Sequence, residues 1–289
     1  MTDRKIAIVT DSTCDLPDSL LAENNIHVVP LRIVYATREY RDRLDITAEK
    51  VYEMLEKEIP KTSLPLTADV MEILDGLIAG GYTDIVYLSI SAGLSGSYNL
   101  IRLLIQQYTG FNIEVVDSCT LSMGLGFLVL EAAREAQRSG DVKAVVARVN
   151  KIRSTMEALF VIKTLEYLKK GGRIGKVEAT VGGILDIKPI IGVGLDGVYH
   201  TLAKVRGFKN SVQKMLSMIV EEYKGKRINV AIVHGSSTAE ALVLLDELKK
   251  VAIVCESFVT QVCPVLGIHT GPGLLGIIAY EALEVPSVG

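Results

Sequence analysis

The chain has 289 residues, with 31 Lys and Arg against 34 Asp and Glu, a net charge of −3. This length predicts one large or two ordinary domains, and the balanced charge argues against a surface that binds nucleic acid. Hydrophobic residues make up 49% of the chain but aromatic residues only 6%, and Trp is absent, so the apolar content is aliphatic. Such a composition is typical of a packed α/β core, and it would also suit a pocket for an alkyl chain.

The sequence carries no sign of a membrane span, a signal peptide or a zinc site. No apolar run is long enough to cross a bilayer, and the first residues enter a strand directly. The four cysteines form no C-x-x-C pair, so no metal site is expected. Reduced thiols in a cytoplasmic protein are the simplest interpretation.

In the first half, short apolar runs alternate with helical patterns. This alternation predicts a parallel sheet covered on both faces. The expected strands are 5–9, 26–35, 84–89 and 113–116, and the expected helices are 17–24, 47–55, 67–79, 100–105 and 122–136.

A turn rich in glycine and hydroxyl groups joins the strand 84–89 to the helix after it. It contains Gly93, Gly96 and three serines, of which Ser95 is central. Backbone N–H groups and the positive end of a helix dipole meet at such a turn and form an anion site. Because the turn holds no Lys or Arg, a carboxylate or a single phosphate fits it better than a polyphosphate. The alternative is that Ser95 or Ser97 only caps the helix.

Two more polar segments precede buried elements in this half. Asp11 and Ser12 follow the first strand, where open α/β sheets place ligand groups, although ordinary turn chemistry explains them equally well. Thr67 is the expected cap of the helix after it. This leaves Thr62 and Ser63 in a loop without an evident structural duty.

The second half begins after a helix at 142–156, which is the expected linker. Its G-x-G-x-x-G match at 192–197 lies between two strands and opens no helix, so it is a hairpin turn and not a dinucleotide site. The expected strands are 160–162, 188–193, 197–204, 229–233 and material within 251–265, with helices at 208–223 and from 238.

Two glycine-flanked residues in this half are candidates for function. A helix that closes at Gly171 directs Arg173 outward, where the alternative is a solvated basic residue. His269 and Thr270 fall in the expected loop 267–276, which holds four glycines, and the alternative is a structural histidine.

Taken in order, the motifs resemble those of the DegV family, the bacterial fatty acid-binding proteins, over nearly the whole chain. Each motif alone is weak, but the ordered set is specific. The matching segments are 10–17 (TDSTCDLP), 62–65 (TSLP), 93–98 (GLSGSY), 117–118 (DS), 124–126 (GLG), 165–175 and 269–273 (HTGPG).

The resemblance implies two α/β domains, the first with a mostly parallel sheet and the second with a mixed sheet, which we expect at 1–155 and 156–289. It implies one long-chain fatty acid bound at their interface and no catalysis by the chain itself. No cofactor or metal is expected. The residues that correspond to the family's carboxyl-binding site are Thr62, Ser63, Ser95, Gly96, His269 and Thr270.

The resemblance also implies a partner, a fatty acid kinase that phosphorylates the bound carboxyl group and so supplies acyl phosphate for phospholipid synthesis. Arg173 corresponds to an exposed basic residue on the surface that faces the kinase. Transient contact with a membrane surface would serve lipid exchange. One position departs from the family pattern: Leu66 stands where a hydroxyl residue usually follows the proline, and Thr67 comes one position later.

Two other classes of function compete with a carrier. The first is a serine hydrolase that acts on an acyl ester through Ser95 and His269, since a strand-to-helix turn and a late histidine are typical of α/β-hydrolases. However, the motif G-x-S-x-G is incomplete, because Ser97 stands at its last position. The second is a structural or regulatory α/β module with an empty cleft.

Overall fold

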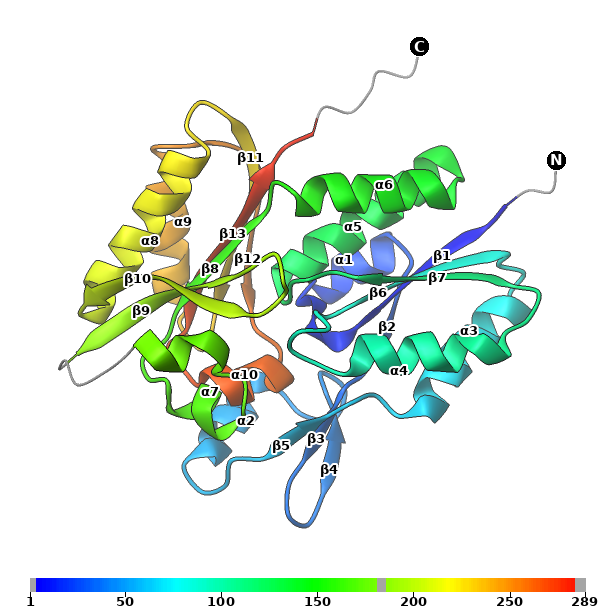
Figure 1. The fold of residues 1–289 in the computed structure, drawn as a ribbon, viewed down its shortest axis with the longest axis horizontal. Helices are drawn as coiled ribbons and strands as arrows, with labels where there is room; N and C mark the ends of the chain where they lie inside the picture. Colours follow the sequence, from blue (N-terminus) through cyan, green and yellow to red (C-terminus); the bar gives the residue numbers. More distant parts are fainter. Residues whose placement is uncertain (1–3, 181–185, 284–289) are drawn as a thin grey trace.

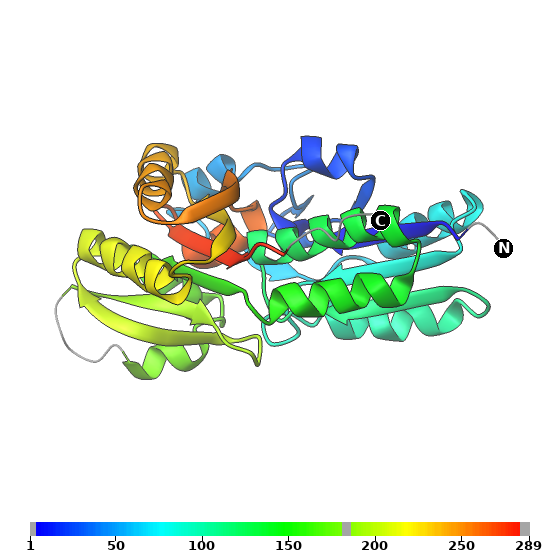
Figure 2. The same ribbon diagram turned by 90° about the horizontal axis from the view of Figure 1, so that it is seen from above.

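The computed structural model describes residues 4–180 and 186–283. The chain forms a parallel four-stranded sheet, a mixed six-stranded sheet and a small antiparallel sheet of three strands (Figure 1). The predicted fold class, α/β with a parallel and a mixed sheet, is confirmed. Figure 2 shows the two larger sheets side by side along the longest axis.

The parallel sheet has the strand order β2-β1-β6-β7. Ala7 and Val9 pack in the core beneath helices α3 and α4, whereas Ile8 between them packs in the core beneath α5. Both faces are therefore buried, which explains the near-continuous apolar runs of these strands. The elements are β1 (Ile6–Asp11), α1 (Asp18–Glu23), β2 (Ile26–Val29), α3 (Thr67–Ala79), β6 (Asp84–Ser89), α4 (Ser97–Leu104), β7 (Asn112–Asp117), α5 (Met123–Ser139) and α6 (Val142–Arg153).

The small sheet, of order β4-β3-β5, holds one of the candidate segments. The prediction of a single strand over 26–35 is wrong: the chain breaks at Pro30, and β3 belongs to this second sheet. Thr62 pairs with Ile33 of β3, so the prediction that Thr62 and Ser63 lie in a loop is also wrong. The elements are β3 (Arg32–Val34), β4 (Glu39–Arg41), α2 (Ala48–Leu55) and β5 (Lys61–Ser63).

The six-stranded sheet has the order β10-β9-β8-β13-β11-β12, and β11 and β12 are its one parallel pair. One face is covered by α8 and α9, and the other faces the first half of the chain. The hairpin expected at 192–197 joins β9 to β10. The elements are β8 (Glu157–Val161), α7 (Glu166–Lys170), β9 (Ile187–Val193), β10 (Tyr199–Arg206), α8 (Phe208–Glu222), β11 (Arg227–His234), α9 (Thr238–Lys249), β12 (Ile253–Gln261), α10 (Pro264–Thr270) and β13 (Leu275–Glu281).

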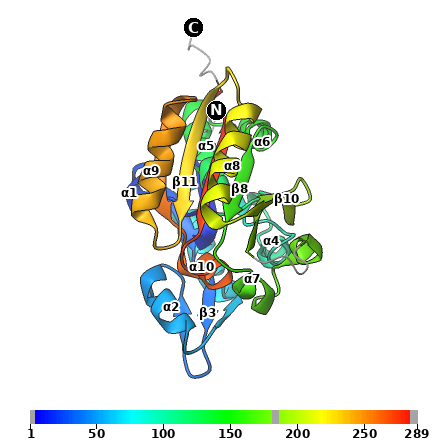
Figure 3. The same ribbon diagram turned by 90° about the vertical axis from the view of Figure 1, so that its left-hand side faces the viewer.

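The structure corrects two predictions, one about a helix cap and one about a loop. Helix α3 begins at Thr67 with Leu66 at the cap position and no capping side chain, so Thr67 is not the cap. The segment predicted as a loop at 267–276 begins inside helix α10. Pro264 stands in its first turn, where a missing N–H costs nothing, and the helix ends at Gly271 with φ +69°. Figure 3 shows α10 between α2 and α7, both of which it contacts.

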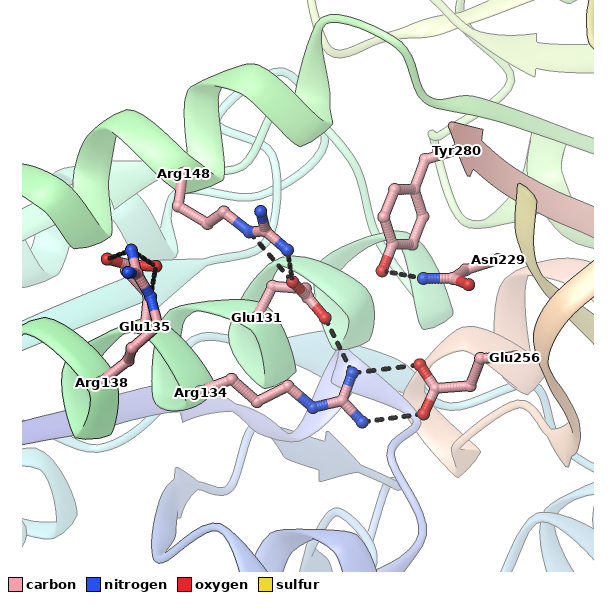
Figure 4. A network of polar contacts seen from close by, with 8 residues as sticks. All are labelled: Glu131, Arg134, Glu135, Arg138, Arg148, Asn229, Glu256 and Tyr280. Carbon is pink, nitrogen blue, oxygen red and sulfur yellow. Dashed lines mark hydrogen bonds and ion pairs between the residues drawn. The ribbon is translucent and has the colours of Figure 1, made fainter. Parts of the chain in front are cut away.

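The two halves share one hydrophobic core and a polar network. Phe127 of α5 packs against Tyr280 of β13, with ring centroids 5.0 Å apart. Nearby, Arg134 of α5 forms two hydrogen bonds with Glu256 of β12, at 2.7 and 3.0 Å, and a third with Glu131 (Figure 4). These contacts fix α5 against the six-stranded sheet. The division of the chain at residue 155 stays a prediction, and the strands of the parallel and six-stranded sheets fall on opposite sides of it.

Candidate functional site

A cavity of about 190 Å³ lies between the two halves, where the turn after β6 meets β5, β10 and α10. It brings together hydroxyl groups of the first half with a histidine and an arginine of the second. Its lining residues are Leu31, Thr62, Ser63, Leu64, Ile90, Leu94, Ser95, Leu121, Arg173, Tyr199, Val265, Leu266 and His269. We call it the polar cavity.

Thr62 and His269 of this cavity form a hydrogen bond, with Oγ1 and Nε2 2.9 Å apart. Burial, with the nearby Arg173, lowers the pKa of His269 to about 4, so the imidazole is neutral at neutral pH. With its proton on Nε2, the ring donates to Thr62 Oγ1. The hydroxyl proton of Thr62 is then free to donate to an anion in the cavity.

The backbone of the loop after α7 holds the other side of the imidazole. A Cβ atom at Gly171 would lie 2.1 Å from His269 Nδ1, so glycine is required there. Within the described residues, this buried Nδ1 has no hydrogen-bond partner, and in particular no carboxylate. His269 is therefore a neutral imidazole held in place by its contact with Thr62 and by the close packing of Gly171.

Ser95 is arranged in a similar way. Its Oγ lies 2.9 Å from the buried Ser97 Oγ and accepts the Ser97 N–H at 3.2 Å. When Ser97 donates its hydroxyl proton to Ser95, the hydroxyl of Ser95 is free to donate to an anion. Helix α4 begins at Ser97 after Gly96, so its N-terminal N–H groups lie next to this hydroxyl. The alternative that Ser95 or Ser97 is the N-cap is wrong, because Gly96 occupies the cap position and no side chain caps the helix.

The turn between β6 and α4, residues 90–96, which we call the serine turn, also contacts the second half directly. Ser91 donates a hydrogen bond from its Oγ to the carbonyl of Gly197 at 2.7 Å. A Cβ atom at Gly93 would lie 2.7 Å from Val198 Cγ1. The close approach of the β9–β10 hairpin thus requires the glycine.

Arg173 is not directed outward, contrary to the prediction from its flanking glycines. It is half-buried, lines the polar cavity and donates to the carbonyl of Leu94 in the first half at 3.4 Å and to that of Gly171 at 2.8 Å. These carbonyls fold the side chain inward. The guanidinium therefore contributes positive charge to a cavity in which the sequence predicted hydroxyl groups, a histidine and the backbone at Gly96, but no arginine.

A second, apolar cavity of about 40 Å³ lies next to the first, against the inner face of the six-stranded sheet. The two cavities share Leu121, Tyr199 and Leu266. The other residues of the apolar cavity are Ser122, Ala158, Leu159, Phe160, Val193, Val233, Val262, Thr270, Leu274 and Ile278.

The structure thus sorts the predicted site residues into three positions. Thr62, Ser63, Ser95 and His269 line the polar cavity together with Arg173. Gly96 adjoins Ser95 at the start of α4. Thr270 instead lines the apolar cavity, and its hydroxyl donates to the carbonyl of Leu266 at 3.1 Å within its own helix.

Sequence reasoning missed Tyr199 and Leu266, which border both cavities. Neither residue lies in a motif, and no local pattern marks them. Among the residues described, no cluster of three or more His, Cys, Asp or Glu side chains could hold a metal ion. Within the same residues, no helix has the length and apolar character needed to span a membrane.

Comparison with known proteins places the chain in a family. The profile of the DegV family matches residues 5–282. A DegV domain-containing protein of Clostridium perfringens is 39% identical over 274 residues, which covers 95% of this chain and 98% of the relative. The chain belongs to the DegV family. The family resemblance predicted from the ordered motifs is thereby confirmed.

Solved structures of fatty acid-binding proteins share the fold. A fatty acid-binding DegV family protein of Thermus thermophilus superimposes with a TM-score of 0.91 at 30% identity, covering 96% of this chain and all of that one. A stearic acid-binding protein of Eubacterium ventriosum superimposes with a TM-score of 0.87 at 26% identity, covering 96% and 98% of the two chains. The fold thus agrees along nearly the full length.

The geometry of the DegV site does not support the serine hydrolase alternative. A hydrolytic serine needs a histidine base within hydrogen-bond reach, oriented by a third group. In the described chain, His269 bonds to Thr62 through Nε2, and its Nδ1 has no partner. The hydrogen-bond partner of the Ser95 hydroxyl is Ser97.

Proposed function

We propose that this DegV-family protein binds one long-chain fatty acid without catalysing a reaction, with the carboxyl group in the polar cavity and the alkyl chain in the apolar cavity. The observation that carries the proposal is the adjacency of the two cavities, which share three residues. One offers hydroxyl donors and a cation, and the other is almost wholly apolar. This pairing matches the two ends of a fatty acid.

The donors of the polar cavity suit a carboxylate. A buried carboxylate without hydrogen bonds is very costly, and Thr62, Ser95 and Arg173 can each donate to it. His269 remains neutral and supports Thr62, so it serves as an orienting donor and not as a base. Backbone N–H groups at the start of α4, next to Gly96, are further donors, and Ser63, which lines the cavity, is exposed.

The alkyl chain supplies most of the affinity, at about 0.8 kcal/mol for each buried CH₂ group. The apolar cavity of about 40 Å³ holds only part of such a chain. We infer that Leu121, Tyr199 and Leu266, which separate the cavities, move apart when the chain is bound. Fatty acids, and stearic acid in one case, are the ligands of the two solved proteins named above, which supports this ligand class.

We further propose that the bound carboxyl group is presented to a fatty acid kinase for acyl phosphate formation and phospholipid synthesis. The site is suited to this because Ser63 and Leu64, which line the cavity, are themselves exposed. Leu64 and Leu66 are 37% and 47% exposed, and such apolar groups suit contact with a partner or, transiently, with a membrane surface. The four free cysteines fit a cytoplasmic protein.

Arg173 then has a role different from the exposed docking residue that the sequence suggested. Because it lines the cavity, we propose that it interacts with the carboxylate and with the negative charge that phosphorylation adds. The domain division at residue 155 would place the fatty acid at the interface of the two domains.

The test of this function is mass spectrometry of the denatured, purified protein, which should release one long-chain fatty acid for each chain. Ser95→Ala and Thr62→Ala should lower its retention and lower kinase-coupled acyl phosphate formation further, because phosphoryl transfer requires the carboxyl group in one position. If both variants and their combination keep normal lipid content and normal coupling, the carboxyl group lies elsewhere.

A further inference from the structure

The loop after β1 carries a motif that the proposed function does not use. Asp11 and Asp15 lie four residues apart, with the short 3-10 turn Ser12–Cys14 between them. Both are buried, at 0% and 3% exposure, and neither lines the polar or the apolar cavity. A buried carboxylate is costly, so its partners indicate what it holds in place.

Asp11 holds the start of the serine turn. Its Oδ2 accepts the N–H of Ile90 at 2.7 Å, and its Oδ1 accepts the N–H of Thr13 at 3.1 Å. Ile90 directly follows β6 and lines the polar cavity, five residues before Ser95. Two backbone donors meet the two oxygens of Asp11, so only a carboxylate satisfies both.

Asp15 holds the start of α10. Its Oδ1 accepts the N–H of Cys263 at 2.8 Å, and its Oδ2 accepts the hydroxyl of Ser122. Its own carbonyl accepts the hydroxyl of Thr260 at 3.0 Å. Cys263 directly precedes α10, the helix that carries His269. One partner of the Asp15 carboxylate is an obligatory donor, whereas the hydroxyl of Ser122 can donate or accept.

We propose that Asp11 and Asp15 are positioning residues for the carboxyl site, Asp11 acting through the serine turn and Asp15 acting through α10. This inference rests on the proposed function. One buried loop of the first half thereby positions both Ser95, in the first half, and His269, in the second half. A binding site loses function when its groups move by about 0.5 Å, so a common support for both sides matters.

The chemistry of the partners distinguishes the two positions. In Asp11→Asn, the amide –NH₂ faces one of two backbone N–H groups, so one hydrogen bond is lost. In Asp15→Asn, the amide oxygen accepts from Cys263 and the –NH₂ donates to Ser122, so both contacts persist. Asp15→Ala removes both. Asp84→Asn is the matched control, because Asp84 is equally buried but starts β6, the strand end opposite to the turn, and bonds to Asn112 at 2.7 Å.

The experiment measures the binding of radiolabelled stearate, with thermal unfolding recorded for every variant. We expect Asp11→Asn and Asp15→Ala to weaken binding about tenfold, as for the loss of one site hydrogen bond. Asp15→Asn and Asp84→Asn should stay within about twofold of wild type. Equal affinity of wild type and Asp11→Asn, or equal losses for Asp15→Asn and Asp15→Ala, would overturn the inference.

A double-mutant cycle separates positioning from general destabilisation. If Asp11 acts through Ser95, Asp11→Asn should weaken binding much less on a Ser95→Ala background than alone. Fully additive losses would refute the role of Asp11. Should Asp11→Asn fail to fold, the comparison of Asp15→Asn with Asp15→Ala tests the inference independently. A wild-type protein that does not bind stearate would instead overturn the proposed function, and this inference with it.

Discussion

Replacement of Thr62 by valine tests the polar cavity at its centre. Valine keeps the shape of threonine and suits the strand β5, so the small sheet should form normally. The substitution removes one hydroxyl group from the cavity and removes the partner of His269 Nε2, which lies 2.9 Å from Thr62 Oγ1. Both consequences can be measured separately.

The expected magnitude follows from these two losses. A hydrogen bond to a charged group contributes about 1.5–3 kcal/mol, so stearate should bind Thr62→Val about 10- to 150-fold more weakly. Without ligand, both nitrogens of the buried His269 then lack partners, which should lower the free energy of unfolding by about 1–3 kcal/mol. Binding should persist, because the alkyl chain contributes about 0.8 kcal/mol for each buried CH₂ group.

The assay is titration of delipidated protein with stearate and, as a control ligand, with octadecanol, which has the same chain and no charge. Thr62→Val should reduce the affinity for stearate more than that for octadecanol, since a neutral hydroxyl makes the weaker hydrogen bond. A folded Thr62→Val protein that binds stearate as tightly as wild type would refute the placement of the carboxyl group. An equal loss for both ligands would show that Thr62 shapes the cavity without meeting the charge.

Three further substitutions test other parts of the structure. Gly171→Ala places a Cβ 2.1 Å from His269 Nδ1, so we expect the imidazole to be displaced. The free energy of unfolding should fall by about 1–3 kcal/mol, and mass spectrometry should show reduced retention of stearate. Normal retention would contradict the tight fit. Burial holds the pKa of His269 at about 4, below its unfolded value, so the free energy of unfolding should fall as pH drops below about 6.5. In chemical denaturation, His269→Gln should remove about 2 kcal/mol of that loss between pH 7 and pH 5. If the free energy of unfolding changed equally with pH in both proteins, His269 would be accessible to protons. Glu256→Gln breaks the partly exposed ion pair with Arg134 and should cost about 0.5–1 kcal/mol of stability. In thermal unfolding, 1 M salt should reduce this loss. A loss that does not depend on salt would mean that the substitution affects packing and not charge.

The sequence predicts the parallel sheet well, because its strands are buried on both faces and keep a local signature. The runs around Val9 and Val86 are apolar without interruption, and helical patterns separate them. The strand β5 has no such signature. Its three residues pair with Arg32–Val34 of β3, and Thr62 lies opposite Ile33, 29 positions earlier, which no local pattern reveals.

Helix α10 was predicted as a loop for a related reason. Glycines at 267 and 271 weaken its intrinsic helical preference, but contact with α2 of the first half stabilises it. The prediction that Arg173 points outward is wrong for a similar reason, since its inward direction depends on the carbonyl of Leu94, 79 residues away. Nor does spacing alone show that Thr62 and His269 meet, 207 residues apart in the chain. The family resemblance supplied that pairing, and tertiary contact creates it.

The position of β13 bears on how the protein is made. This strand is the last one described, yet it lies in the middle of the six-stranded sheet and pairs with both β8 and β11. On a ribosome, the strands on its two sides therefore cannot unite until residues 275–281 have emerged. Helix α10, which carries His269, precedes β13 by only a few residues. A nascent chain thus completes the polar cavity only after β13 has emerged and the second sheet has closed around it.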